Sequence, residues 1–244
     1  MKILTLNTWQ ERGPWKERWE IILKGLKEHA PDIVMLQEMF NREWAEEVRV
    51  CSGYEHLIFS AEPGGQMILT RFPAEQTGCL TMKTKSPTED YRRYALYAKL
   101  NAAGTSIHVF NTHLSWRLEE TEIRKKQVQE LVEFIRSKGR KGTAFVAGDF
   151  NAPPDTLEIS KLMVDAGFMD LFSVMHPKDP GLTWNNVNPF TAGSSVKMPD
   201  RRIDYIFARG ITVPKVKEVR LVYTQPIDNL YASDHFGVLA TVDF

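Results

Sequence analysis

Cysteine, net charge and long apolar runs are all scarce in this sequence. Among 244 residues, only Cys51 and Cys79 are cysteines, too few for a disulfide framework, so we expect a reducing compartment, the cytoplasm. We expect no secretory leader, because an apolar strand pattern begins at residue 3 without a charged segment before it. No apolar run approaches the roughly 18 residues that a membrane-spanning helix needs, so we also expect no membrane span.

An excess of either charge is absent too. Lys plus Arg and Asp plus Glu both total 31, so the formal net charge is zero and no global positive field would attract nucleic acid. A local basic groove stays open as an alternative. The 43% hydrophobic content suffices for a large core, and no linker-like composition interrupts the chain. We therefore expect residues 1–244 to form a single domain, and the protein to be a monomer.

The chain opens with a strand, a helix and a second strand. An apolar run at 3–7 predicts the first strand and another at 33–37 predicts the second. Between them, a helical pattern starts after Pro14. Its predicted buried positions are Trp15, Trp19, Ile22, Leu23 and Leu26, and its predicted polar positions are Arg18, Glu20, Lys24 and Lys27. The spacing favours a core role for both tryptophans over a ligand-binding role.

The rest of the chain mixes consecutive strands with a further strand-helix-strand unit, so that each half of the chain contains one. We expect helices near 42–51, 119–138 and 156–166, the last capped by Asp155 and ended by Gly167, and strands near 54–59, 66–70, 79–82, 95–100, 106–111, 143–148, 203–208, 215–223 and 238–242. The segment 170–201 lacks periodicity and is predicted to be a long loop. Two sheets packed together with helices outside satisfy this pattern.

Polar side chains stand where the predicted strands end. In Phe145-Val-Ala-Gly-Asp-Phe-Asn151, Asp149 and Asn151 are two residues apart and so point the same way. Other strand ends carry Asn7, Glu38, His113, Asp204, Asp234 and His235. Groups that bind metals or transfer protons therefore collect at strand-loop junctions, as in open-sheet active sites.

Each of these residues alone also has a structural interpretation. Asn7 and Asn151 are common turn formers, Glu38 could begin a helix, and His113 could be a hydrogen-bonded structural histidine. Asp204 could pair with a neighbouring arginine, Arg201 or Arg202. Their joint occurrence favours one reaction, the attack of water on phosphorus assisted by a divalent cation. No Cys/His cluster has zinc spacing.

Roles follow from the chemistry of the groups. Glu38 is the first candidate ligand for Mg²⁺, helped by Asn7 and Asp234, with Mn²⁺ able to substitute. Asp149 is the candidate base or water-orienting group, and Asn151 would donate to a phosphoryl oxygen.

The remaining groups would bind the charge on the phosphate. Held by Asp204, His235 would be a positioned donor to the developing charge. His113 and Arg93 would complete an electrostatic clamp on the phosphate oxygens.

Six segments carry a resemblance to a known superfamily. They are Leu4-Thr-Leu-Asn-Thr-Trp9, Leu36-Gln-Glu38, Asn111-Thr-His-Leu114, Gly148-Asp-Phe-Asn151, Arg202-Ile-Asp-Tyr205 and Ser233-Asp-His235. In type and order they resemble the motifs of the endonuclease/exonuclease/phosphatase superfamily, the fold of pancreatic deoxyribonuclease. The resemblance implies a four-layered α-β-β-α sandwich, Mg²⁺-dependent phosphoesterase activity and a site at one end of the two sheets.

The resemblance also implies residue roles. By position, Glu38 matches the main metal ligand with Asn7 and Asp234 beside it, and Asp149 and Asn151 match the water-orienting pair. Asp204 and His235 match a carboxylate-histidine pair, and His113 matches a phosphate-contacting histidine. Arg93 is a looser match to a phosphate-binding arginine, and Arg92 could take that role instead.

The motifs indicate the chemistry better than the substrate. Zero net charge and a short chain favour a small phosphorylated metabolite, with a nuclease as the alternative and a sphingomyelinase-like phosphodiesterase third. We expect the 170–201 segment to determine specificity. Within it, Trp184 and Asn186 could stack on and hydrogen-bond a sugar or base, although Trp184 could equally close the edge of the core.

Overall fold

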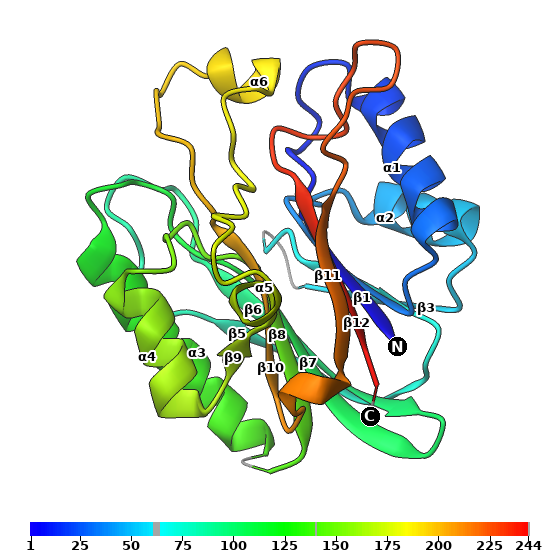
Figure 1. Cartoon of the computed structure of the whole chain (residues 1–244), viewed down its shortest axis with the longest axis vertical. Coiled ribbons are helices and arrows are strands. Elements are labelled where there is room, and N and C mark those ends of the chain that lie inside the picture. The colour runs from blue at the N-terminus through cyan, green and yellow to red at the C-terminus, as the bar shows by residue number, and fades with distance from the viewer. Residues whose placement is uncertain (61–63, 140, 244) are drawn as a thin grey trace.

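Two six-stranded sheets pack face to face in the computed structural model, which describes residues 1–60, 64–139 and 141–243 (Figure 1). The first sheet has the order β11-β12-β1-β2-β4-β3 and the second β5-β6-β7-β8-β10-β9. The strands are β1 (Lys2–Asn7), β2 (Ile33–Gln37), β3 (His56–Phe59), β4 (Met67–Thr70), β5 (Ala74–Thr81), β6 (Tyr94–Ala102), β7 (Thr105–His113), β8 (Thr143–Asp149), β9 (Met169–Asp170), β10 (Asp204–Arg209), β11 (Val216–Val222) and β12 (Gly237–Val242).

Four longer helices cover the outer faces of the sheets. Helices α1 (Trp15–His29) and α2 (Arg42–Ser52) lie on the first sheet, and α3 (Thr121–Lys138) and α4 (Leu157–Ala166) lie on the second (Figure 1). The expected four-layered α-β-β-α sandwich is thus confirmed. No helix in the described part of the chain is long and apolar enough to cross a bilayer.

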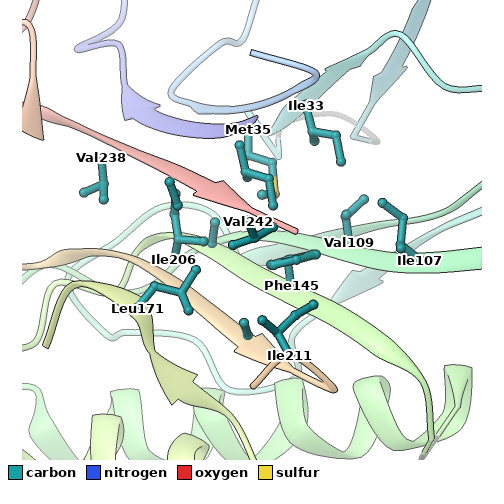
Figure 2. Packing of buried hydrophobic residues seen from close by; sticks show 14 of the residues in the cluster. Ile33, Met35, Ile107, Val109, Phe145, Leu171, Ile206, Ile211, Val238 and Val242 are labelled. Carbon is teal, nitrogen blue, oxygen red and sulfur yellow. The ribbon is translucent and has the colours of Figure 1, made fainter. Parts of the chain in front are cut away.

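The core forms three apolar layers, as a sheet with two buried faces requires. The middle layer lies between the sheets and includes Ile33, Met35, Val109, Phe145 and Ile206 (Figure 2). A second layer joins one sheet to α3 and α4, and a third joins the other sheet to α1 and α2. Because both sheets are held on two sides, their strand ends are rigid supports for a site.

Three local predictions were wrong. Strand β5 begins at Ala74 and not near residue 79, because its first half is an exposed polar edge without apolar alternation. The 170–201 segment is not a plain loop: it contains α5 (Leu171–Met175) and α6 (Pro189–Ala192), which are too short for a helical period. The residue that caps α4 is Thr156 rather than Asp155.

Arg18 is buried, although the helical pattern placed it among polar residues. Its guanidinium donates hydrogen bonds to the carbonyl oxygens of Thr8, Trp9, Gln10, Arg12 and Ala232. Arginine carries five N–H donors, so one side chain can organise the whole turn that follows β1. That turn forms part of the wall of the site described below.

Strand register brings the predicted polar residues to one end of the sandwich. In the second sheet, Asp149 pairs with His113 on one side and with Asp204 on the other. In the first sheet, β12 runs antiparallel to β1, so the residues before Gly237 lie beside the end of β1 at Asn7. In Figure 1 this end is at the top of the view, on the same side as α6 and opposite the two chain termini.

Candidate active site

Asp149 is the centre of a polar cluster drawn from both sheets. Its Oδ2 accepts a hydrogen bond of 3.0 Å from Asn7 Nδ2, and His113 Nε2 and His235 Nε2 lie 3.4 and 3.7 Å from the same oxygen. Burial raises the pKa of Asp149 to about 6, with a further rise from Asp204 and an opposing effect of His235. Such a pKa suits a base that works near neutral pH.

His235 is held between two carboxylates. Its Nδ1 lies 2.8 Å from Asp204 Oδ2, which turns Nε2 toward Asp149 and the cavity. Burial alone would lower the pKa of His235, but the negative charges of Asp204 and Asp149 outweigh it and raise the pKa to about 10. His235 is therefore an imidazolium with one N–H fixed by Asp204 and the other free to bind an oxyanion.

A close backbone contact supports Asp149. Gly148 has φ of 137°, and a Cβ on it would lie 1.9 Å from the carbonyl oxygen of Thr112. Only glycine allows β7 and β8 to approach this closely.

Asn151 and Glu38 both have left-handed backbones just beyond strand ends, with φ of 50° and 62°. The Asn151 N–H donates to Asp149 Oδ1 at 2.8 Å, and one amide hydrogen of its side chain is used by the carbonyl of Leu114. Strained residues of this type persist where surrounding structure fixes them, and they concentrate at functional sites.

Glu38, Asp234 and Asn7 form a second group in the same cavity. Asn7 Nδ2 lies 3.4 Å from Glu38 Oε1, while Asn7 Oδ1 accepts from the Trp9 N–H. Burial raises the pKa of Asp234 to about 7, and the nearby charge of Glu38 adds to the rise. Two carboxylates in one cavity fit a divalent cation, which would neutralise both.

A different triple, Asp149, Asp204 and His235, also has ligand atoms close enough to share an ion, within 4.8 Å of one another. Its histidine is already protonated between the two carboxylates, so we assign this triple to acid-base chemistry. The cation-ligand roles of Glu38, Asp234 and Asn7 stay predictions.

His113 and Arg93 lie on the other side of Asp149. Burial holds the pKa of His113 well below its usual range, and Arg93 and His235 lower it further, so His113 is neutral. Arg93 lines the cavity, and its guanidinium binds both carboxylate oxygens of Glu89. Arg92 instead donates to the backbone of Met82 and Lys83, so the structure brings Arg93 and not Arg92 to the site.

Of the two residues predicted from the 170–201 segment, only one reaches the cavity. The Trp184 ring stands edge-on to His235 with centroids 5.0 Å apart. Asn186 is exposed and donates to Asp200 Oδ1 and to the carbonyl of Met198, so the structure does not bring it to the site. Its amide stabilises a surface turn instead.

Two supporting residues were missed by sequence reasoning. Glu89 fixes Arg93 and also accepts from the Ser115 hydroxyl. Residues 89–93 lie outside any helix, so their four-residue spacing gave no signal. Thr183 Oγ1 accepts from the backbone N–H groups of Ile203 and Asp204 and so fixes the start of β10. Nothing in the sequence marks Thr183, because its partners lie 20 and 21 residues away.

One cavity of about 510 Å³ unites the site. The predicted residues that line it are Asn7, Glu38, Arg93, His113, Asp149, Asn151, Trp184, Asp234 and His235. Asp204 does not line the cavity but contacts His235 through Nδ1. The cavity thus offers a base, a charged hydrogen-bond donor and a pair of carboxylates around one space, which is what hydrolysis of a phosphate ester requires.

Comparison with known proteins agrees with this geometry. The model of the endonuclease/exonuclease/phosphatase family matches residues 4–235. The chain belongs to this family. Members of the family are phosphoester hydrolases, so the enzyme class predicted from the motifs is confirmed at the level of the family.

Individual relatives are distant. An uncharacterised protein of Caenorhabditis elegans is 32% identical over 129 residues, which cover 41% of this chain and 40% of that protein. Phospholipase C of Staphylococcus aureus is 24% identical over 73% of this chain and 56% of its own length. The chain therefore spans about half the length of these relatives.

Solved structures confirm the fold. The structure of D. rerio TDP2 with a single-stranded DNA product is 18% identical and aligns over 100% of this chain and 99% of that one, with a TM-score of 0.83. Beta toxin of Staphylococcus aureus is 16% identical with a TM-score of 0.79, and each chain is covered completely.

Proposed function

We propose that the protein is a divalent-metal-dependent hydrolase of phosphate diesters. The observation that carries the proposal is the position of Asp149 Oδ2, within 3.7 Å of His235 Nε2 and in the same cavity as Glu38 and Asp234. A base, a cationic donor and a cation site then surround one phosphate.

The chain's own groups supply the proton transfers. Asp149 accepts a proton from a water molecule whose oxygen attacks phosphorus, while the bond from phosphorus to the leaving oxygen breaks and that oxygen takes a proton from solvent. His235 donates a hydrogen bond through Nε2 to a phosphoryl oxygen as charge develops. Arg93 and neutral His113 orient the phosphate.

Mg²⁺ fits the oxygen ligands of Glu38 and Asp234, and Mn²⁺ is the expected substitute. A cation held there would polarise a phosphoryl oxygen and stabilise the leaving oxygen.

The diester preference rests on the relatives. Phospholipase C and the tyrosyl-DNA phosphodiesterase 2 of Gallus gallus, which is 22% identical over 98% of this chain, are both named for diester cleavage. Our expectation of a small phosphorylated metabolite finds no support in these names, and the TDP2 structure holds DNA. Zero net charge is the observation that keeps a small substrate as the second candidate.

Hydrolysis of two chromogenic esters tests the proposal. The purified protein is incubated with bis(p-nitrophenyl) phosphate and with p-nitrophenyl phosphate, each with Mg²⁺, Mn²⁺ or EDTA. We expect metal-dependent release of nitrophenol, faster from the diester. Faster release from the monoester would favour a phosphatase, and no release with any metal would refute hydrolysis.

A further inference from the structure

Arg201 is a buried cation that forms no ion pair with any described residue. Its side chain lines the catalytic cavity, yet the residue is only 5% exposed. Nε and Nη1 have no hydrogen-bond partner among the described residues, and Nη2 contacts the thioether sulfur of Met198, a weak acceptor. Burial lowers the pKa of Arg201 against the opposing charges of Asp149 and Asp204, and no carboxylate among the described residues lies within ion-pair distance of its guanidinium. Unsatisfied buried donors of this kind are costly.

The adjacent arginine shows how this protein satisfies a structural guanidinium. Arg202 is 4% exposed, and its Nη1 lies 2.5 Å from Asp170 Oδ2 while Nη2 donates to the Ser173 hydroxyl, which leaves Nε without a partner among the described residues. Two neighbouring arginines are thus equally buried, but only Arg202 has an ion pair. The comparison indicates that Arg201 is positioned for a group that is not part of the chain.

Backbone pairing places Arg201 in line with the catalytic histidine. Trp184 exchanges two hydrogen bonds of 2.9 Å with Arg201, and on its other side it pairs with His235. Directly paired residues of antiparallel strands project to the same face. The three side chains therefore form a row along the cavity wall, with the backbone of Arg201 two strand spacings, about 10 Å, from that of His235.

The end of this row carries N–H donors without partners among the described residues. Besides Arg201 Nε and Nη1, the buried indole Nε1 of Trp184 has no partner in the described structure. Free N–H groups around a guanidinium match an anionic oxygen group, and the planar fork of arginine suits phosphate in particular. His235 and Asp149 already serve the phosphate that is cleaved, so this second position is separate from theirs.

We propose that Arg201 and Trp184 bind a second phosphate of the substrate, next to the ester that is cleaved. The proposal rests on the proposed hydrolase function, because it treats His235 as the marker of the scissile phosphate. A second phosphate could belong to a small bisphosphorylated ester or to the next nucleotide of a chain. In both cases Arg201 would select substrates with two phosphates over those with one.

Matched substrates test this selection. We would measure kcat/KM for the p-nitrophenyl ester of thymidine 5′-phosphate with and without a 3′-phosphate, and for the corresponding pair of glycerol phosphate esters. The wild type should prefer the phosphorylated member, and Arg201→Met should reduce the preference roughly 10- to 100-fold, the value of a charge-assisted hydrogen-bond pair. A preference in both pairs indicates a free phosphate, and one confined to the nucleoside pair indicates a nucleotide chain.

Two variants separate binding from folding. Arg201→Lys keeps the positive charge but lacks the paired N–H donors of the guanidinium, so it should retain part of the preference for substrates with two phosphates. Arg202→Lys is the matched control: it weakens the pair with Asp170 and should lower the melting temperature but keep the preference. Because the Arg201 charge is unpaired, Arg201→Met should leave the melting temperature equal or higher. A lower melting temperature with an unchanged preference would show that Arg201 is structural.

A binding measurement keeps the test independent of catalysis. Calorimetric titration with thymidine 3′,5′-bisphosphate and with thymidine 5′-monophosphate should show tighter binding of the bisphosphate, and Arg201→Met should abolish the difference. If the wild type cleaves none of the esters but binds the bisphosphate more tightly than the monophosphate, the proposed hydrolase function is refuted and the phosphate subsite is supported. Equal binding of both nucleotides by the wild type would overturn the subsite.

Discussion

The catalytic cavity has two unlike halves. In the acid-base half, Asp149, Asp204 and His235, the imidazolium of His235 lies between two carboxylates, so each carboxylate has a cationic partner within the chain. In the carboxylate half, Glu38 and Asp234, burial and the like charge of Glu38 raise the pKa of Asp234 against the charges of His235 and Arg18, and neither carboxylate forms an ion pair with a described residue. The first half is ready to act without a ligand, whereas the second needs a cation to complete it.

This difference predicts different consequences of mutation. A change in the acid-base half should reduce turnover at every metal concentration, since its members act in the transition state. A change in the carboxylate half should alter the metal requirement first. If variants of both halves changed turnover and metal requirement alike, the two halves would act as one unit.

The largest effect is expected for Asp149→Asn. The variant keeps the shape of the side chain but cannot accept the proton of water, so kcat should fall by about 10²–10⁴-fold with an unchanged metal titration. Steady-state hydrolysis of bis(p-nitrophenyl) phosphate measures both quantities. Asp155→Asn, at an exposed position just beyond the site, is the matched control and should behave as wild type. Turnover near that of the wild type would remove Asp149 from the mechanism.

Glu38→Gln should act mainly on the metal. Loss of one negative oxygen ligand should raise the Mg²⁺ concentration for half-maximal activity by roughly 10- to 100-fold, while kcat at saturating Mg²⁺ falls much less. A titration of activity against Mg²⁺, with Glu43→Gln on the exposed surface of α2 as the control, measures the shift. An identical titration curve would exclude Glu38 as a ligand.

Asn7→Ala tests how strongly the halves are coupled, because the Asn7 amide contacts both Asp149 and Glu38. We expect a loss of about tenfold in kcat and a similar rise in metal requirement, as for one hydrogen bond to a charged group. In the double variant with Glu38→Gln, the effects on metal requirement should combine to less than their sum in free energy. Strict additivity would mean that Asn7 does not link the halves.

Strand ends were predictable from the sequence, and the partners of buried charges were not. Asn7, Glu38 and Asp149 follow clear apolar runs, so their convergence needed only the order of strands that the motifs implied. The partners of Arg18 depend instead on the turn after β1 that folds back over it, which leaves no periodic pattern.

The errors have the same physical origin. The first half of β5 is an exposed edge, α6 has a single turn, and Asn186 bonds to a nearby turn instead of facing the cavity. In each case local hydrogen bonding, and not burial of an apolar face, determines the conformation. Hydrophobic periodicity carries no information about such segments.

A pH-dependent change in stability, measured on folding and not on turnover, also distinguishes the carboxylate half. Burial and Glu38 raise the pKa of Asp234 from 3.8 to about 7, so between these values the folded chain holds a proton that the unfolded chain has released. The free energy of unfolding of the metal-free protein therefore falls as pH rises through this window, by about 4 kcal/mol at most from this group. Asp234→Asn removes that dependence.

Melting temperatures in EDTA at pH 5, 6 and 7 measure the difference. As pH rises, the melting temperature of Asp234→Asn should increase relative to that of the wild type. The difference should be roughly 2–4 °C for each kcal/mol in a chain of this size. Mg²⁺ should then restore the wild type and act less on the variant, because binding to the folded state alone stabilises it. Parallel curves in EDTA would mean that Asp234 is already neutralised by the chain, and that the carboxylate half needs no cation for charge balance.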